Sequence, residues 1–171
     1  MFKILKERLI KGIVTRYIKP EACADISASG KELKALIQKR FGRSLQIREV
    51  DTGSCAGCES EIIQANSPIY DLQRFGISFV ASPRHADALL VTGALSKNML
   101  LALRKTYDAL PEPKFVITLG DCALDGGIFK DSYYTEGAIK DYLSVVLHVP
   151  GCPPSPEKII RSLCAFLKKS K

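Results

Sequence analysis

Apolar and polar positions alternate with two different periods along the chain, and together they predict a fold of strands and helices. From about residue 45 onward, short apolar runs alternate with segments of helical spacing. We predict strands at Leu45–Val50, Ile77–Val80, Ala88–Thr92, Lys114–Leu119 and within Tyr142–Val149. We predict helices at Glu59–Ala65, Lys97–Leu110 and Pro156–Lys168. Such alternation predicts an α/β fold, with a mostly parallel sheet covered by helices on both faces.

The first 44 residues follow another pattern, typical of a basic helical extension. Apolar residues recur at helical spacing through residues 1–19, with lysines and arginines between them, as in an amphipathic helix. A second helix is predicted from Gly30 to Phe41. We therefore expect a basic N-terminal helical extension at residues 1–44 and an α/β domain at residues 45–171.

Charge is distributed unevenly along the chain. The formal net charge is +7, but twelve lysines and arginines against four acidic residues lie within residues 1–48, and the remainder carries thirteen against fourteen. A basic surface over the whole domain is therefore absent from the sequence, and we expect no nucleic-acid partner. The basic helix of residues 1–19 has two open interpretations: it packs on a neighbouring subunit, or it lies on anionic lipid as a peripheral membrane contact.

Composition favours a folded cytoplasmic protein. Hydrophobic residues make up 46% of the chain, yet no apolar run approaches the roughly 20 residues that span a bilayer. The N-terminal segment lacks the uncharged stretch of a secretory signal, so we expect a cytoplasmic location. Six cysteines in such a chain are better explained as metal ligands or buried thiols than as disulfides.

Four of the cysteines follow predicted strands. Cys55 and Cys58 come after the strand at 45–50, and Cys122 and Cys152 each follow a later strand. Because the carboxyl ends of parallel strands share one edge of the sheet, three distant loops can bring four thiolates together. Glycines beside these cysteines allow close approach of the backbone and free amide groups to point at bound sulfide.

The residue types leave several chemistries open. Four thiolates suit one [4Fe–4S] cluster, but they also suit a structural zinc ion, and Cys55 with Cys58 alone would suit a redox-active dithiol. Cys164 lies on a helical apolar stripe and is expected in the core, and His148 within an apolar strand is expected to be a core imidazole. The role of Cys23 is left open.

Four motifs together resemble one family. They are Cys-Ala-Gly-Cys-Glu at residues 55–59, Ser-Pro-Arg-His-Ala-Asp at 82–87, Gly-Asp-Cys-Ala-Leu-Asp-Gly-Gly at 120–127 and Pro-Gly-Cys-Pro-Pro at 150–154. The resemblance is to the small subunit of [NiFe] hydrogenases and the related 20-kDa subunit of complex I. It implies a flavodoxin-like fold and one proximal [4Fe–4S] cluster held by Cys55, Cys58, Cys122 and Cys152.

The first motif distinguishes branches of this family. The complex I version is similar but has adjacent cysteines, whereas Ala-Gly separates Cys55 from Cys58, as in the hydrogenase version. The chain most resembles the small subunit of membrane-bound, energy-converting hydrogenases of the formate hydrogenlyase type. That likeness implies electron transfer between a ferredoxin-like iron–sulfur subunit and a catalytic large subunit, in a complex with membrane-arm subunits. The alternative is a complex I-like subunit that delivers electrons to quinone.

The resemblance also directs attention to three further residues. Glu59 directly follows a predicted ligand and either caps a helix or serves an interface or proton relay. Arg84 and His85 begin the turn before a buried strand, where an interface role and a plain surface role both stay open. For the whole complex, the resemblance implies a peripheral position on the inner face of the cell membrane.

Overall fold

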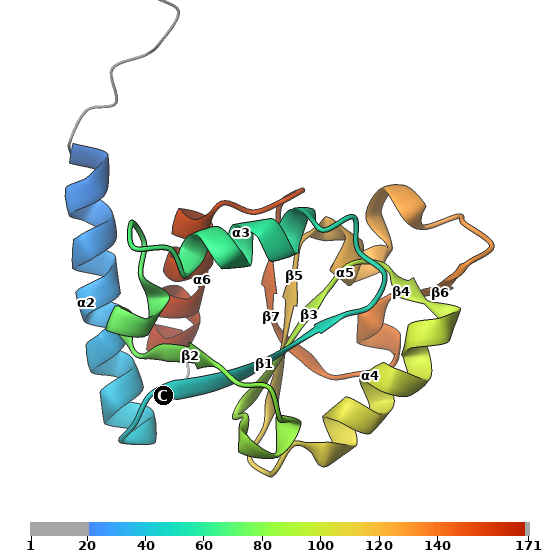
Figure 1. Cartoon of the computed structure of the whole chain (residues 1–171), viewed down its shortest axis with the longest axis horizontal. Coiled ribbons are helices and arrows are strands. Elements are labelled where there is room, and N and C mark those ends of the chain that lie inside the picture. Colours follow the sequence, from blue (N-terminus) through green and yellow to red (C-terminus); the bar gives the residue numbers. More distant parts are fainter. Residues whose placement is uncertain (1–20, 170–171) are drawn as a thin grey trace, which may run out of the picture.

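A five-stranded sheet lies at the centre of the computed structural model, which describes the backbone of residues 21–169 and the side chains of residues 26–169. Its strands run in the order β2-β1-β3-β5-β7, and every neighbouring pair is parallel (Figure 1). They are β1 (Leu45–Asp51), β2 (Ile77–Phe79), β3 (Ala88–Thr92), β5 (Phe115–Leu119) and β7 (Val145–Val149). The predicted α/β class with a parallel sheet is confirmed.

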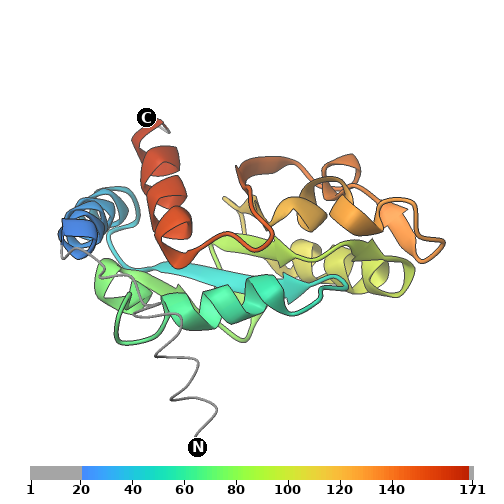
Figure 2. The same cartoon turned by 90° about the horizontal axis from the view of Figure 1, so that it is seen from above.

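Helices cover both faces of this sheet. The helices of the described part are α2 (Glu21–Phe41), α3 (Gly57–Ala65), α4 (Lys97–Ala109), α5 (Asp121–Asp125) and α6 (Pro156–Lys169), with 3-10 turns η1 (Leu72–Phe75), η2 (Pro83–His85), η3 (Gly127–Phe129) and η4 (Ile139–Asp141). One core lies beneath α2, α3 and α6, and a second core lies beneath α4, α5 and η4. Figure 2 shows α2 and α6 side by side at one end of the molecule.

β3 explains why two cores form. All five of its residues are buried, and successive side chains of a strand point to opposite faces. Ala88 and Leu90 therefore enter the first core, while Leu89 and Val91 enter the second. The uninterrupted apolar run that predicted this strand is typical of a parallel strand buried on both faces.

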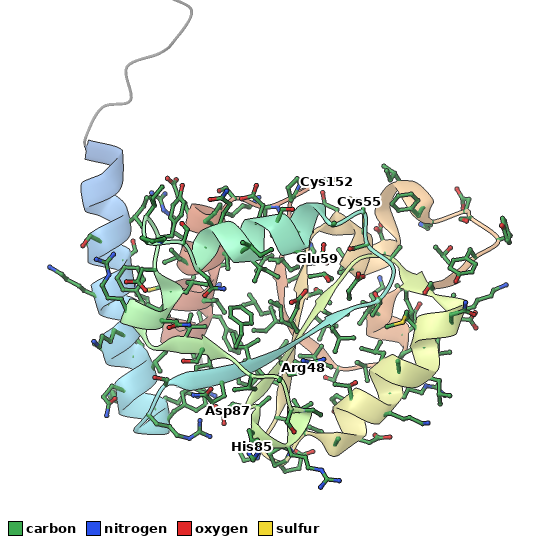
Figure 3. All side chains as sticks on the ribbon, viewed as in Figure 1. Arg48, Cys55, Glu59, His85, Asp87 and Cys152 are labelled. Atoms are coloured by element: carbon green, nitrogen blue, oxygen red, sulfur yellow. The ribbon has the colours of Figure 1, made fainter. Side chains whose placement is uncertain are left out.

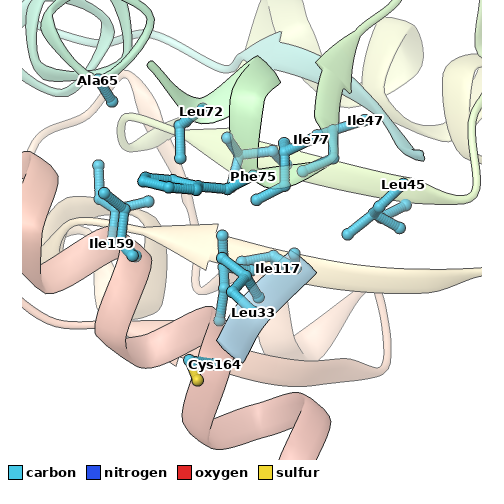
Figure 4. Packing of buried hydrophobic residues seen from close by; sticks show 14 of the residues in the cluster. Leu33, Leu45, Ile47, Ala65, Leu72, Phe75, Ile77, Ile117, Ile159 and Cys164 are labelled. Atoms are coloured by element: carbon cyan, nitrogen blue, oxygen red, sulfur yellow. The ribbon is translucent and has the colours of Figure 1, made fainter. Parts of the chain in front are cut away.

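The helix that precedes the sheet is longer than predicted. We expected it to begin at Gly30, but α2 begins at Glu21. Gly30 is an interior residue of the helix, where it makes room for a packed neighbour and does not mark the start. The ring of Phe75 packs where a Cβ at Gly30 would lie. Leu33 and Ile37 are fully buried in the first core, and Figure 4 shows Leu33 there. The helix predicted within residues 1–19 lies outside the described residues.

A small second sheet lies beside the first. β4 (Leu95–Ser96) and β6 (Thr135–Gly137) pair antiparallel, and neither was predicted, because neither Leu-Ser nor Thr-Glu-Gly shows an apolar run or alternation. This pairing holds the segment after α5 next to α4. Within the described residues, none of the helices combines the length and apolar character needed to cross a membrane.

Candidate metal centre

Four cysteines surround one cavity of about 100 Å³ at the carboxyl edge of the sheet. Cys55 lies in the loop after β1, Cys58 in the first turn of α3, Cys122 in α5 and Cys152 in the loop after β7. Figure 3 shows Cys55 and Cys152 at the same edge of the molecule. Gly93, which follows β3, also lines the cavity. Strands β1, β3, β5 and β7 all contribute to the site through the loops that follow them.

The thiols oppose one another's ionisation. Burial, together with the negative charges of Glu59 and of the other three thiols, raises the pKa of the Cys58 thiol to about 12. Burial, Cys152 and Cys55 likewise raise the pKa of Cys122. All four thiols are free of disulfides. Bound cations would offset this repulsion, so the arrangement favours a metal-bound state of the thiolates over a set of free thiolates.

Hydrogen bonds hold the first cysteine loop in position. The carboxylate oxygen Oδ1 of Asp51 accepts bonds from the amides of Gly53 and Ser54, at 2.8 and 2.7 Å. Nearby, the buried Thr52 hydroxyl donates to the Thr92 carbonyl at 2.7 Å. These contacts fix the loop after β1 against the loop after β3.

The two later loops are tied to each other by Asp121. Its Oδ1 accepts a bond from the Gly151 amide at 2.8 Å, and its own amide donates to the Gly151 carbonyl at 2.9 Å. Asp121 and Asp125 begin and end the short helix α5. The five-residue helix was missed because it is too short to show a helical repeat.

Glu59 has a buried carboxylate beside a cysteine. Neither of its carboxylate oxygens is exposed, and neither has a hydrogen-bond partner within the described structure. Its charge raises the pKa of Cys58, and after burial it is the main cause that raises the pKa of Glu49 on β1. A buried carboxylate without a hydrogen-bond partner is unfavourable unless another group pairs with it. The predicted interface or relay role would supply such a group.

Arg84 and His85 lie far from the cysteines. They belong to η2, which precedes β3, so they are at the amino edge of the sheet, and Figure 3 shows His85 opposite Cys55. Neither residue is buried, and neither lines the cysteine cavity. Any interface that they form is therefore on another side of the domain.

The remaining singled-out residues are structural where they are described. Cys164 is 5% exposed within the first core, as predicted. His148 is partly buried, and its Nδ1 lies 3.0 Å from the Thr118 hydroxyl, within hydrogen-bonding distance. Burial lowers the pKa of this imidazole. The side chain of Cys23 lies outside the described residues.

The cavity is larger than one metal ion requires. A zinc ion draws its thiolates to about 2.3 Å from a single point. Among the described residues, no three His, Cys, Asp or Glu side chains are close enough to enclose such an ion. The cavity of about 100 Å³ exceeds the roughly 10–15 Å³ that is needed to hold one water molecule. Four thiols spread around such a space suit a polynuclear iron–sulfur cluster.

Phe129 is a residue of the site that the sequence did not reveal. It lines the cavity beside Cys122, from the turn η3 that follows α5. Gly126 and Gly127 both have a positive φ and turn the chain back toward the cysteine here, so this glycine pair was the signal that the sequence offered.

The fold and the site together define the class of protein: a parallel α/β domain that presents four thiols, as candidate metal ligands, at the carboxyl edge of its sheet. Sequence comparison gives the family. Residues 55–166 match the family described as NADH ubiquinone oxidoreductase, 20 Kd subunit. The chain belongs to this family.

Known relatives are subunits of oxidoreductase complexes. The chain is 43% identical over 135 residues to the probable membrane-bound hydrogenase subunit mbhJ of Pyrococcus furiosus, covering 79% of this chain and 81% of that protein. It is 42% identical over 131 residues to formate hydrogenlyase subunit 7 of Escherichia coli, covering 77% and 51%. It is 43% identical over 127 residues to an NADH-quinone oxidoreductase subunit of Desulfovibrio desulfuricans, covering 74% and 67%.

Solved structures share the fold. A chain of the membrane-bound sulfane sulfur reductase, an archaeal respiratory membrane complex, has a TM-score of 0.67 and 32% identity, covering 78% of this chain and 73% of that one. A chain of an NAD+-reducing [NiFe]-hydrogenase has a TM-score of 0.56 and 19% identity, covering 74% and 93%. The second likeness concerns the fold alone, and it agrees with the α/β architecture described above.

Proposed function

We propose that this chain is an electron-transfer subunit that holds one [4Fe–4S] cluster through Cys55, Cys58, Cys122 and Cys152. The observation that carries this proposal is the convergence of four free thiols on one cavity. A single zinc ion needs its thiolates closer to one point than these four thiols lie. A redox-active dithiol formed by Cys55 and Cys58 would not explain why Cys122 and Cys152 line the same cavity. The cluster, when bound, supplies one-electron redox chemistry.

The protein's own residues ligate the cluster and control its surroundings. Cys58 and Cys122 are partly buried and limit the access of water, whereas Cys55 and Cys152 are exposed. We assign these two exposed thiols to the side of the cluster that a partner approaches. Gly57 and Gly93 line the cavity and let the backbone approach a cluster closely, and the cluster's surroundings set its potential. No substrate bond is broken on this chain.

The complex that we propose is a membrane-associated, energy-converting hydrogenase. In it, the chain passes electrons between a ferredoxin-like subunit and the catalytic large subunit, on the cytoplasmic face of the membrane and next to membrane-arm subunits. The names of the relatives from Pyrococcus furiosus and Escherichia coli support this assignment. So does the Cys-Ala-Gly-Cys spacing at residues 55–58.

The second candidate is a complex I-like subunit that delivers electrons to quinone. The family description names this kind of subunit. The chain is also as similar to an NADH-quinone oxidoreductase subunit, at 43% identity, as it is to a hydrogenase subunit, at 43% identity. The similar chain of a sulfane sulfur reductase indicates that related complexes carry out other reactions as well. The partner's large subunit separates the two candidates, since only the hydrogenase type carries two Cys-x-x-Cys pairs for nickel and iron.

Glu59, Arg84 and His85 are proposed as interface residues. The unpaired carboxylate of Glu59 supports a contact, or a proton relay, with the subunit that covers the cysteine cavity. Arg84 and His85 lie at the opposite edge of the sheet, so we assign them to a contact with a different subunit.

Replacement of single cysteines tests the cluster. Anaerobically purified wild-type protein should be brown, contain about four irons per chain and give an EPR signal on reduction. Cys55→Ala, Cys58→Ala, Cys122→Ala and Cys152→Ala should each lose most of that iron. Cys164→Ala is the matched control, because that thiol is buried in the first core and does not line the cavity. Full iron loading of any two of the four variants, or a colourless wild type that contains zinc, would contradict the proposal.

Activity of the intact complex tests the reaction. If the complex is a hydrogenase, hydrogen should reduce a viologen dye through it, and Cys58→Ala should abolish electron transfer to the ferredoxin-like subunit. Quinone reduction without any hydrogen-dependent dye reduction would select the complex I-like alternative.

A further inference from the structure

The turn after α5 holds one peptide unit against a cysteine sulfur. The chain reverses at Gly126 and Gly127, whose φ values of 91° and 50° lie in the left-handed region that favours glycine. Gly127 has no room for a side chain, because a Cβ there would lie 2.9 Å from Cys122 Sγ and 3.1 Å from the Cys122 Cα. The peptide unit that joins Gly127 to Ile128 therefore lies close to the thiol of Cys122.

The backbone amide of Ile128 donates to this sulfur. Burial is the largest cause that raises the pKa of the Cys122 thiol, and the charges of neighbouring thiols raise it further, whereas a backbone hydrogen bond from Ile128 lowers it. In the described part of the chain, no backbone carbonyl accepts a bond from the Ile128 amide. The Ile128 side chain is 82% exposed. The residue thus presents its side chain to solvent and its amide to the cysteine.

Neighbouring contacts fix the direction of this amide. The Oδ1 atom of Asp125 accepts a bond from the Gly127 amide at 3.0 Å. The Phe129 amide donates to the Gly126 carbonyl at 2.9 Å. The amides on both sides of Ile128 thus have other acceptors, and the turn leaves the amide between them for the sulfur. Successive backbone amides in such a turn form a concave site that favours negative charge.

An amide directed at a ligating sulfur affects the redox state of a cluster. Reduction adds negative charge to the cluster and its thiolate ligands, so a donor to one thiolate stabilises the reduced state more than the oxidised state. Hydrogen bonds to the sulfurs are accordingly among the factors that set the reduction potential of an iron–sulfur cluster. A backbone amide does not titrate, so its effect on the potential does not vary with pH.

We propose that the Ile128 amide donates to the Cys122 thiolate of the bound cluster and thereby raises the cluster's reduction potential. The glycine pair at 126–127 and Asp125 position this amide, and Asp125 acts through the Gly127 amide. The inference rests on the proposed function, because it concerns a cluster that Cys122 ligates. The potential of the cluster determines in which direction electrons pass between it and the neighbouring redox centres of the complex.

A potentiometric EPR titration of the anaerobically purified full chain tests this proposal. Ile128→Pro removes the amide hydrogen. Ile128→Ala is the matched control, because it keeps that hydrogen and changes only an exposed side chain. At the midpoint potential of the wild type, the ratio of reduced to oxidised cluster should be about tenfold lower in Ile128→Pro, a downward shift of about 59 mV for one electron. Ile128→Ala should titrate as the wild type does.

A second pair of variants tests the same amide if the proline variant holds no iron. Asp125→Asn and Asp125→Ala both remove a negative charge, but only alanine also removes the oxygen that binds the Gly127 amide. The potential of Asp125→Ala should therefore lie below that of Asp125→Asn.

Three results overturn the proposal. They are an unchanged potential in an iron-loaded Ile128→Pro, an equal shift in Ile128→Ala, and, where Ile128→Pro holds no iron, equal potentials in the two Asp125 variants. A wild type without iron and without an EPR signal refutes the proposed function instead. A normal wild-type signal with unshifted variants refutes only the role of the amide.

Discussion

Gly120 leaves no room for a side chain beside the Cys58 thiol. A Cβ at residue 120 would lie 2.5 Å from Cys58 Sγ, and the φ of 86° is in the left-handed region that favours glycine. Gly42 also has a left-handed φ, of 66°, but a Cβ there would have no neighbour within 4 Å. Comparing alanine substitutions at these two glycines therefore distinguishes the cost of the left-handed backbone from the cost of a contact with the thiol.

We predict that Gly120→Ala destabilises the protein by about 1–3 kcal/mol more than Gly42→Ala, because the added methyl forces Cys58 to move. Urea unfolding of both variants measures the difference. Iron content should fall in Gly120→Ala and stay at the wild-type level in Gly42→Ala. Equal stability of the two variants would show that the thiol can shift freely.

Glu49 is an acidic residue held in unfavourable surroundings. Burial raises the pKa of its carboxyl, and the charges of Glu59 and Asp51 raise it further, against the opposing effect of Arg48. The folded protein thus binds the proton more tightly than the unfolded chain, in which the carboxyl has its ordinary pKa of 4.5. Stability is therefore lost as the pH rises from about 4.5 through the raised folded pKa, and the loss persists at neutral pH.

The variant Glu49→Gln should accordingly be more stable than the wild type at pH 7, and the gain should shrink toward pH 4. Denaturant unfolding of the cluster-free protein at several pH values measures this difference. Glu136→Gln, at an exposed position of β6, should show no such gain. A gain for Glu49→Gln that does not depend on pH would contradict the assigned cause.

At the scale of elements, one aspartate joins two cysteine loops. Asp121 begins α5 and binds the amide of Gly151, thirty residues away, next to Cys152. Asp125, at the other end of α5, accepts a bond from the Gly127 amide within its own turn, at 3.0 Å. The first contact joins two cysteine loops, whereas the second shapes one of them.

We predict that Asp121→Ala lowers the unfolding free energy by about 1 kcal/mol, less than the roughly 1.5–3 kcal/mol typical of a hydrogen bond to a charged group, because this carboxylate is exposed. It should also reduce cluster content, since only the backbone bond from the amide of residue 121 to the Gly151 carbonyl then joins the loops of Cys122 and Cys152. Asp125→Ala should affect the cluster less. Thermal unfolding and iron analysis of both variants check this order, and the reverse order would refute the tie between the loops.

The elements that could be predicted are those with a recognisable apolar pattern. β3 is a continuous apolar run and its ends were predicted correctly, and even the three-residue β2 has apolar residues at alternate positions. β4, β6 and α5 show no such pattern. The start of α2 was missed because its glycine serves the packing of Phe75, a contact between residues 45 positions apart. Local pattern does not encode such a contact.

The candidate site was predictable for the same reason as the strands. Each cysteine follows a recognisable strand, so the shared edge of the sheet could be inferred without distances. Two features of the site depend on loop conformation, which has no sequence periodicity. They are the hydrogen bond between Asp121 and Gly151 and the position of Phe129 in the lining of the cavity. Arg84 and His85 were singled out by motif, and their position before β3 already implied the opposite edge.

At the scale of the whole molecule, two cores hold the sheet while the cysteine loops lie outside both. Cys58 is the one cysteine of the four that packs against a core, as a partly buried neighbour of the first. The sheet is therefore expected to fold without iron, and the cluster adds stability by joining loops that the cores leave free.

Iron removal under anaerobic conditions should then lower the melting temperature without abolishing the cooperative transition. Each kcal/mol of lost stabilisation corresponds to about 2–4 °C for a chain of this size. Calorimetry before and after chelation measures the shift. Cys58→Ala, which should hold no cluster, is expected to show no shift on chelation. Complete unfolding of the iron-free wild type would contradict this division between cores and loops.

The distribution of the four thiols along the chain also bears on biosynthesis. Cys55 and Cys152 are 97 positions apart, and the cavity between them exists only once β7 has joined β5. A ribosome that has released only the first cysteine pair presents two unsupported thiols to the cell. Cofactor delivery is thereby restricted to a late stage, after translation has passed the last strand.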